Sequence, residues 1–197
     1  NKEKLILWHG DIGHAKNLPH NLINALNNIY KKKPFILNLV SNGKIKILNA
    51  EFKYRFHKYS LETISDLLHI SDLGISTSLY SNKKPSIFSL NNYGRQRYKS
   101  DRILRYKYVS NPARAFLFSQ HGVPFVCDEN PEHFIFNDIE WSPICWSEKS
   151  WKNKINKCLN GNTNGIIELQ FELFKKYHKY DTYLSLVKSG KLTIIES

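Results

Sequence analysis

The chain has 197 residues, of which 41% are hydrophobic and 13% aromatic. This apolar content is enough to bury a core, which excludes an intrinsically disordered chain. Twenty-nine Lys and Arg residues stand against 17 Asp and Glu, a net charge of +12. That charge favours an anionic partner such as a phosphorylated metabolite, a nucleic acid or an acidic membrane surface.

The longest apolar runs are far shorter than the ~20 residues of a membrane-spanning helix, and no secretory signal precedes them. We therefore expect a soluble, cytoplasmic protein. Its three cysteines are odd in number and lack C-x-x-C spacing, which favours buried, reduced thiols over disulfides or a zinc site. No metal or other cofactor is expected. The chain contains no methionine, which we expect of a fragment or of a sequence from which modified methionines were omitted.

The N-terminal part alternates predicted strands and helices. A strand in "KLILWHG" and a polar turn precede a helix within 18–33, where apolar residues recur at helical spacing. "PFILNLVSNGKIKILNA" predicts a strand, a turn at Asn42 and Gly43, and a second strand. "KYRFHKYS" then leads to a helix at 61–71, and "DLGISTSL" adds a short strand. This order predicts an α/β fold with a mostly parallel sheet and helices on both faces.

A basic insert at about 80–107 comes next, and its length favours a functional or mobile segment. After it, the sequence predicts a helix from about 112 to 121. Ser110 or Asn111 caps its start, and Gly122 takes the left-handed conformation at its end.

The remaining elements are a buried strand in "PFVCD", an extended piece in "HFIFND", and a helix in "SEKSWKNKINKCL" with Ser147 as its cap. A long amphipathic helical segment follows at about 165–190. No repeat or linker divides the chain, so one domain over 1–197 is expected.

Two segments have the features of a ligand site at the carboxyl ends of parallel strands. In "WHGDIGHAKN", Gly10 and Gly13 let the backbone approach a ligand, and His14 and Lys16 supply donors. A plain tight connection explains this segment equally well.

In "YVSNPARAF", Ser110, Asn111 and the N–H groups behind them could hold one phosphate. Arg114, one turn further on, could bind another through a bidentate hydrogen bond. The alternative is that Asn111 only caps the helix and Arg114 is solvated, and the residues alone leave both open.

The order of these features resembles the C-terminal, donor-binding domain of GT-B fold glycosyltransferases, over nearly the whole chain. The segments that carry the resemblance are "LILWHGDIGHAKNLPHNLINAL", "ISDLGIST", "SNPARAFLFSQHGVPFV" and "WSPICWSEKSWKNKINKCL". It implies a Rossmann-like domain, one half of a GT-B architecture, that binds a nucleotide-diphosphate sugar for transfer to an acceptor. The acceptor site and the catalytic base would belong to an N-terminal domain or a partner chain.

The resemblance also implies roles for individual residues. The residues that it places around the donor diphosphate and ribose are Gly10, Gly13, His14, Lys16, Ser110, Asn111 and Arg114. By position alone, the turn at His57, Lys58 and Tyr59, after the fourth predicted strand, would contact the nucleobase.

In the basic insert, Lys99 and Arg102 are candidates for a lid that closes on the diphosphate, and a solvated basic loop is the alternative. The insert could also contact acidic lipid headgroups.

One departure from the family pattern concerns two glutamates, eight residues apart, that many retaining members carry. Val109 and Leu117 stand at those positions, so no retaining mechanism is assigned.

Two other classes stay open at this stage. Tyrosines interleaved with basic residues in "NNYGRQRYKSDRILRYKY" would suit a nucleic-acid-binding protein, although no recognised nucleic-acid motif is present. A non-catalytic, donor-binding partner subunit is the other alternative.

Overall fold

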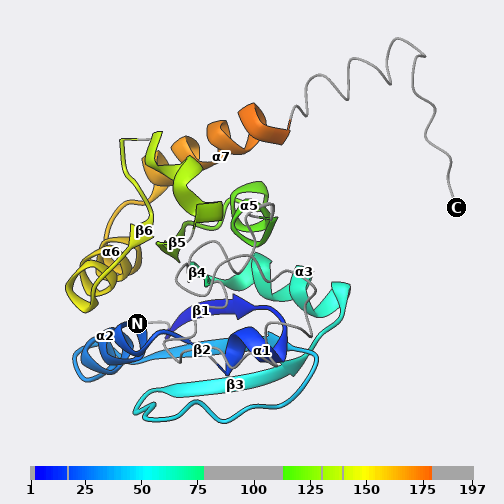
Figure 1. Cartoon of the computed structure of the whole chain (residues 1–197), viewed down its shortest axis with the longest axis vertical. Coiled ribbons are helices and arrows are strands. Elements are labelled where there is room, and N and C mark those ends of the chain that lie inside the picture. Colours follow the sequence, from blue (N-terminus) through cyan, green and yellow to red (C-terminus); the bar gives the residue numbers. More distant parts are fainter. Residues whose placement is uncertain (1–2, 17, 78–112, 130, 139, 179–197) are drawn as a thin grey trace, which may run out of the picture.

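The structure is a computed structural model that describes residues 3–16, 18–77, 113–129, 131–138 and 140–178. Within these residues six parallel strands form one sheet in the order β3-β2-β1-β4-β5-β6 (Figure 1). The strands are β1 (Lys4–His9), β2 (Phe35–Ser41), β3 (Lys53–Lys58), β4 (Leu73–Ser76), β5 (Phe125–Asp128) and β6 (Ile144–Cys145). This is the strand order of doubly wound, nucleotide-binding α/β folds.

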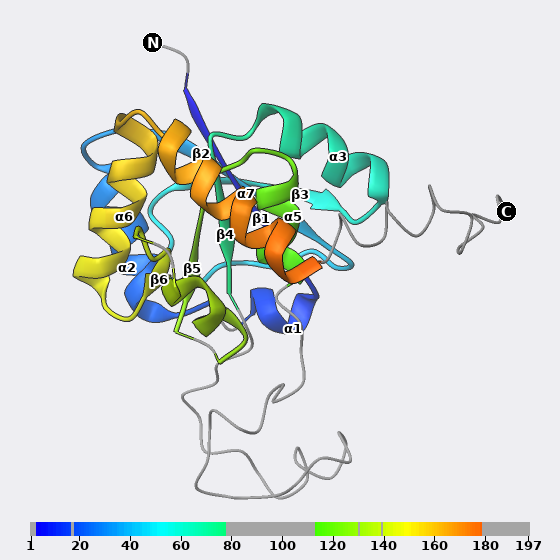
Figure 2. The ribbon, with the colours of Figure 1, turned by 90° about the horizontal axis from the view of Figure 1, so that it is seen from above.

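Helices cover both faces of the sheet (Figure 2). One face carries α2 (His20–Tyr30) and α6 (Glu148–Asn160), which pack side by side. The other face carries α3 (Leu61–Ile70), α5 (Ala113–Gln120) and α7 (Asn164–His178). A short helix α1 (Ile12–Ala15) follows β1, and a 3₁₀ helix η1 (Pro131–Asp138) follows β5. The predicted α/β fold with a parallel sheet is thus confirmed.

The core has two halves, one on each face of the sheet. Because successive residues of a strand point to opposite faces, Trp8 packs with the α2 and α6 side while Leu7 packs with the α3 and α5 side. Every residue of β2 is buried, as expected for a central parallel strand that is covered on both faces.

Helix α5 lies directly against β4. A Cβ atom at Gly74 would come within 2.4 Å of the Phe118 ring, so only glycine lets this ring rest on the strand. At the other end of α5, Gly122 has a φ of 65°, and the Val123 N–H donates to the Phe118 carbonyl at 3.0 Å. The predicted left-handed helix end at Gly122 is confirmed.

Helix α7 supplies hydrogen bonds that a strand would otherwise make. The Gln170 side chain, which is fully buried, accepts from the Phe125 N–H at 3.2 Å and donates to the Phe125 carbonyl at 3.0 Å. Since β6 pairs only with Cys127 and Asp128, the side-chain amide satisfies the beginning of β5.

Two predicted elements are wrong. The segment after Gly43 forms no strand, because β2 pairs instead with β3, and Ile45 and Ile47 are buried as parts of a loop. "HFIFND" is not extended but belongs to η1.

The other predicted elements agree with the structure. Ser147 caps α6 by accepting from the Ser150 N–H at 3.1 Å. The predicted C-terminal helical segment is confirmed as far as His178. Residues 179–190 and the insert at 80–107 lie outside the described residues. None of the helices in the described part of the chain has the length and apolar character needed to cross a membrane.

Candidate functional site

A pocket of about 510 Å³ opens at the carboxyl end of β1, between α3 and α5. The strand order of the sheet reverses at β1, because β2 and β3 lie on one side of β1 and β4 to β6 lie on the other. In folds of this kind, ligands bind at this point, and the pocket lies beside it. Its residues come from the ends of three strands and from two helices.

The polar end of the pocket is formed by Gly10, Asp11, Asn42, Tyr59 and Arg114. Its other wall is mainly apolar, because α3 and α5 contribute Leu61, Ile64, Leu68 and Leu117, with Ser65 and His121 beside them. The pocket therefore offers a charged end next to an apolar surface.

Arg114 and Gly10 are in direct contact although they are far apart in the sequence. An added Cβ at residue 10 would lie 2.8 Å from Arg114 Nη1 and 3.0 Å from the Trp8 ring. Any side chain at this position would displace the guanidinium group. Glycine therefore allows the arginine of α5 to reach the end of β1.

Asp11 organises the turn after β1. Its carboxylate accepts from the Gly13 N–H at 2.7 Å and from Asn42 Nδ2 at 3.0 Å. Asn42 Oδ1 in turn accepts from the Ile12 N–H at 3.0 Å. The Gly13 hydrogen bond is the largest contribution that lowers the pKa of Asp11, so this carboxylate is ionised beside the pocket and faces the same space as Arg114.

His9, the last residue of β1, is 6% exposed and lines the pocket. Its ring packs edge-on against Phe118, with the centroids 5.4 Å apart. Burial and then the Arg114 charge lower the pKa of His9 to about 4, against a weaker opposing hydrogen bond with the Arg114 backbone. His9 is therefore neutral at physiological pH. Among the described residues, its Nε2 has no hydrogen-bond partner.

The structure brings together three of the predicted site residues, Gly10, Tyr59 and Arg114. The expected loop from Gly10 to Lys16 is instead the short helix α1 with its own cap, since the Gly13 N–H bonds to Asp11. Gly13, His14 and Lys16 are not among the described residues that line the pocket.

The predicted nucleobase turn follows the third strand rather than the fourth, because the strand expected after Gly43 does not form. Tyr59 lines the pocket, but Lys58 is exposed on the edge strand β3. His57 Nε2 is hydrogen bonded to the buried Asn38 Oδ1 at 3.0 Å. Burial and then Arg55 lower the pKa of His57.

Several predicted residues cannot be placed. Ser110, Asn111, Val109, Lys99 and Arg102 lie outside the described residues.

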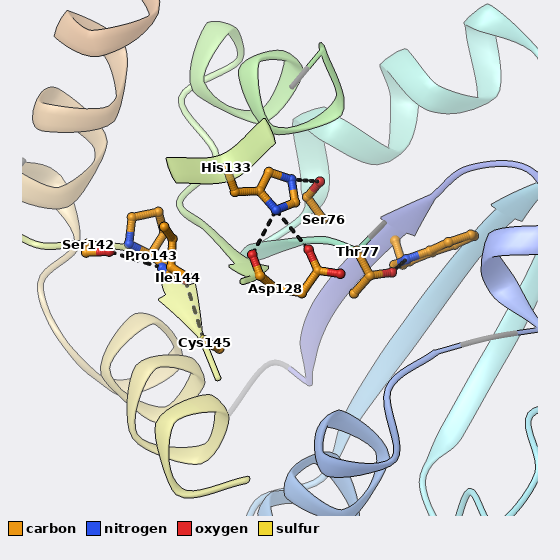
Figure 3. Close-up of polar contacts among 9 residues, drawn as sticks. Ser76, Thr77, Asp128, His133, Ser142, Pro143, Ile144 and Cys145 are labelled. Atoms are coloured by element: carbon orange, nitrogen blue, oxygen red, sulfur yellow. Dashed lines mark hydrogen bonds and ion pairs between the residues drawn. The ribbon is translucent and has the colours of Figure 1, made fainter. Parts of the chain in front are cut away.

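A buried polar network that the sequence did not predict lies at the carboxyl ends of β4 and β5 (Figure 3). His133 of η1 lies with Nδ1 2.8 Å from Asp128 Oδ1 and 2.9 Å from the Asp128 carbonyl, and with Nε2 3.2 Å from Ser76 Oγ. All three residues are buried. The available signal was His133, five positions after Asp128 at the end of a predicted strand. Because the segment was predicted to be extended, His133 was not expected to turn back toward Asp128.

The ionisation of His133 follows from its neighbours. Burial opposes the charged form, but Cys127 and Asp128 outweigh burial and raise the pKa of His133 well above its ordinary value. Burial also raises the pKa of Cys127, so we assign the charge partner as Asp128. A buried imidazolium–carboxylate pair thus joins η1 to β5.

The three cysteines are buried and unpaired by disulfides, as predicted. Burial raises the pKa of Cys145 and raises that of Cys158 to about 12, so these thiols are unreactive. In the described part of the chain, no group of three or more His, Cys, Asp or Glu side chains could hold a metal ion.

A scan against protein-family models finds no match, and a search of curated proteins finds none either. Solved structures do match. The catalytic domain of cholesterol-alpha-glucosyltransferase from Helicobacter pylori is 17% identical, with a TM-score of 0.54, and the match covers 91% of this chain and 99% of that one.

Two further structures are longer. HepE from Anabaena in complex with UDP and glucose is 14% identical with a TM-score of 0.56, and the match covers 95% of this chain and 48% of HepE. An alpha,alpha-trehalose-phosphate synthase (UDP-forming) from Burkholderia vietnamiensis is 10% identical with a TM-score of 0.51, and the match covers 96% of this chain and 46% of the synthase.

The chain therefore spans nearly all of the first neighbour and slightly less than half of the other two. These three structures are of GT-B glycosyltransferases. The chain has the Rossmann-like fold of a GT-B glycosyltransferase domain, as the sequence resemblance implied.

Proposed function

We propose that this domain binds the nucleotide-diphosphate sugar donor of a glycosyltransferase. The observation that carries the proposal is the contact between Arg114 and Gly10 at the carboxyl end of β1, inside a pocket with an apolar wall. A nucleotide diphosphate has the matching parts, because its base is flat and largely apolar on its faces and its phosphates are anionic.

In this proposal the Arg114 guanidinium binds the diphosphate and stabilises the negative charge that develops on it as the sugar departs. The base lies against the wall formed by Leu61, Ile64 and Leu117, next to the Tyr59 ring. HepE has been solved in complex with UDP-glucose and in complex with UDP and glucose, which makes UDP the first nucleotide to test.

We extend the proposal to the other predicted contacts of the diphosphate and ribose, which are Gly13, His14, Lys16, Ser110 and Asn111. Lys99 and Arg102 stay candidates for a lid. Transfer itself needs an acceptor site and a base, which we assign to an N-terminal domain or a partner chain. Cationic side chains supply the charge for the diphosphate, so we propose that no metal or other cofactor is required.

The alternatives lead to different outcomes. A nucleic-acid-binding protein is not favoured by the fold, and it would be stabilised by oligonucleotides rather than by nucleotides. A non-catalytic partner subunit would bind the nucleotide sugar but would not increase turnover when its second domain is supplied. Contact of the basic insert with an acidic membrane and a cytoplasmic location are further parts of the proposal that need their own tests.

Thermal unfolding in the presence of UDP, ADP, GDP and UDP-glucose tests the proposal. We expect at least one nucleotide to raise the Tm, by a few degrees at saturating concentration, and we expect Arg114→Ala to lose most of that rise. Arg55→Ala is the matched control, because it removes the same charge from an exposed position on β3. If oligonucleotides stabilise the protein and no nucleotide does, the proposal is wrong.

A further inference from the structure

His9 is a buried polar residue whose second ring nitrogen has no hydrogen-bond partner among the described residues, although the residue lines the pocket. Leaving such an atom unsatisfied costs stability. A phenylalanine ring would fill the same space and keep the edge contact with Phe118 without that cost. The unsatisfied nitrogen therefore points to a partner that arrives with the ligand.

The chemistry of this nitrogen follows from its surroundings. The His9 ring is neutral beside the Arg114 charge, and a hydrogen bond with the Arg114 backbone engages it. Because Nε2 makes no such bond, we assign the bond, and with it the ring proton, to Nδ1. In that tautomer Nε2 carries a lone pair and can only accept a hydrogen bond.

An acceptor nitrogen discriminates among the groups of a nucleotide. Phosphate oxygens carry no proton at neutral pH and would be repelled by the lone pair, whereas a hydroxyl group can donate to it. His9 lines the same pocket as Arg114 and the apolar residues of α3 and α5. The hydroxyl-bearing part of a nucleotide that lies between its base and its diphosphate is the ribose.

We propose that His9 Nε2 accepts a hydrogen bond from a ribose hydroxyl, so that His9 selects ribonucleotides over nucleotides that lack these hydroxyls. The inference rests on the proposed function, because it requires a nucleotide in this pocket. Other pocket acceptors are less suited to the role. Asp11 already accepts hydrogen bonds from the Gly13 N–H and from Asn42 Nδ2, and Asn42 Oδ1 accepts one from the Ile12 N–H.

The test compares binding of three probes by calorimetry. The first is whichever of UDP, ADP and GDP binds best, the second is its 2′,3′-dideoxy form, and the third is inorganic pyrophosphate. For the wild-type chain we expect the dideoxy form to bind about fivefold to tenfold more weakly, which corresponds to one hydrogen bond.

His9→Phe removes the acceptor and keeps the ring. We expect it to bind the ribonucleotide as weakly as the dideoxy form and to bind pyrophosphate as the wild type does. His9→Gln, which restores an acceptor oxygen, should recover part of the preference. His20→Phe is the matched control, because His20 is an exposed histidine at the start of α2, and thermal unfolding of each variant checks that it folds.

The outcomes separate the two proposals. If the wild type binds both nucleotide forms equally, or if His9→Phe keeps the preference, the role of His9 is refuted while nucleotide binding stands. If His9→Phe weakens pyrophosphate as much as the nucleotide, His9 acts only on the packing of Arg114 and the inference fails. If no nucleotide binds, both proposals fail.

Discussion

Single residues control whether the pocket exists. Gly10 is the clearest case, because the space that a side chain would take there is already occupied by the Arg114 guanidinium and the Trp8 ring. A guanidinium at the end of a flexible side chain can move aside, so a larger residue at position 10 would change binding more than stability.

We therefore predict that Gly10→Ala weakens binding of the best nucleotide about tenfold, the size expected when a charge-assisted hydrogen bond is lost. Calorimetry measures the change in Kd. Gly165→Ala is the control, because nothing lies within 4 Å of a Cβ added there. Unchanged nucleotide affinity in Gly10→Ala would show that Arg114 does not need this approach to act.

The buried pair of His133 and Asp128 makes a prediction about pH. Because the folded-state pKa of His133 is raised, its contribution to the free energy of unfolding is complete below its unfolded-state pKa of ~6.5 and is lost as pH rises through the folded-state value. We predict that His133→Gln destabilises the protein by about 3 kcal/mol at pH 6, since it leaves a buried carboxylate without its partner.

Urea unfolding of the wild type and of His133→Gln between pH 6 and 10 measures this difference. The difference in the free energy of unfolding between the wild type and His133→Gln should narrow toward pH 10. His20→Gln, at an exposed site, should show no gap at either pH. A gap for His133→Gln that does not vary with pH would mean that His133 is neutral in the folded protein.

At the scale of elements, a side chain makes backbone hydrogen bonds that a short strand does not make. Gln170 of α7 takes the place of a strand partner at Phe125, and no local sequence pattern predicts such a contact. We expect Gln170→Leu to cost about 3 kcal/mol, because it leaves a buried N–H and a buried carbonyl unsatisfied.

Chemical unfolding checks this value, with Gln120→Leu as the control at an exposed glutamine of α5. Equal stability of the two variants would mean that water or another group satisfies Phe125. The predicted loss would also be refuted if Gln170→Leu left the unfolding midpoint of the wild type unchanged.

The same scale explains what the sequence could and could not predict. Helical spacing and caps predicted α2, α3, α5 and α6, because an apolar stripe and a capping side chain are local signals. The alternation of Ile45 and Ile47 resembles the pattern of a strand. In the structure β2 pairs with β3 instead, and this pairing depends on tertiary contacts rather than on the local sequence.

The candidate site was predicted in the same uneven way. Gly10 and Arg114 were predicted from the glycine-containing turn and the helix start, and both line the pocket, while their roles in binding stay predictions. The unmet hydrogen bond of His9 and the buried contacts of His133 were not predicted, because they depend on contacts between distant segments. The assignment of Ser110 and Asn111 stays a prediction.

At the scale of the whole molecule, the match covers slightly less than half of HepE. The net charge of this chain, +12, is consistent with an anionic ligand and would also attract other polyanions. For that reason, nucleotide binding should be measured at physiological salt, where weak contacts between exposed charges are screened.

The contact between Gly10 and Arg114 also has a consequence in time. Residue 10 leaves the ribosome before residue 114, and the guanidinium that completes the pocket is synthesised only after four of the described strands. Parallel strands that pair across long stretches of chain assemble slowly. A growing chain that ends before α5 can pair the strands from β1 to β4. It still lacks Arg114, so it cannot yet bind a ligand in this pocket.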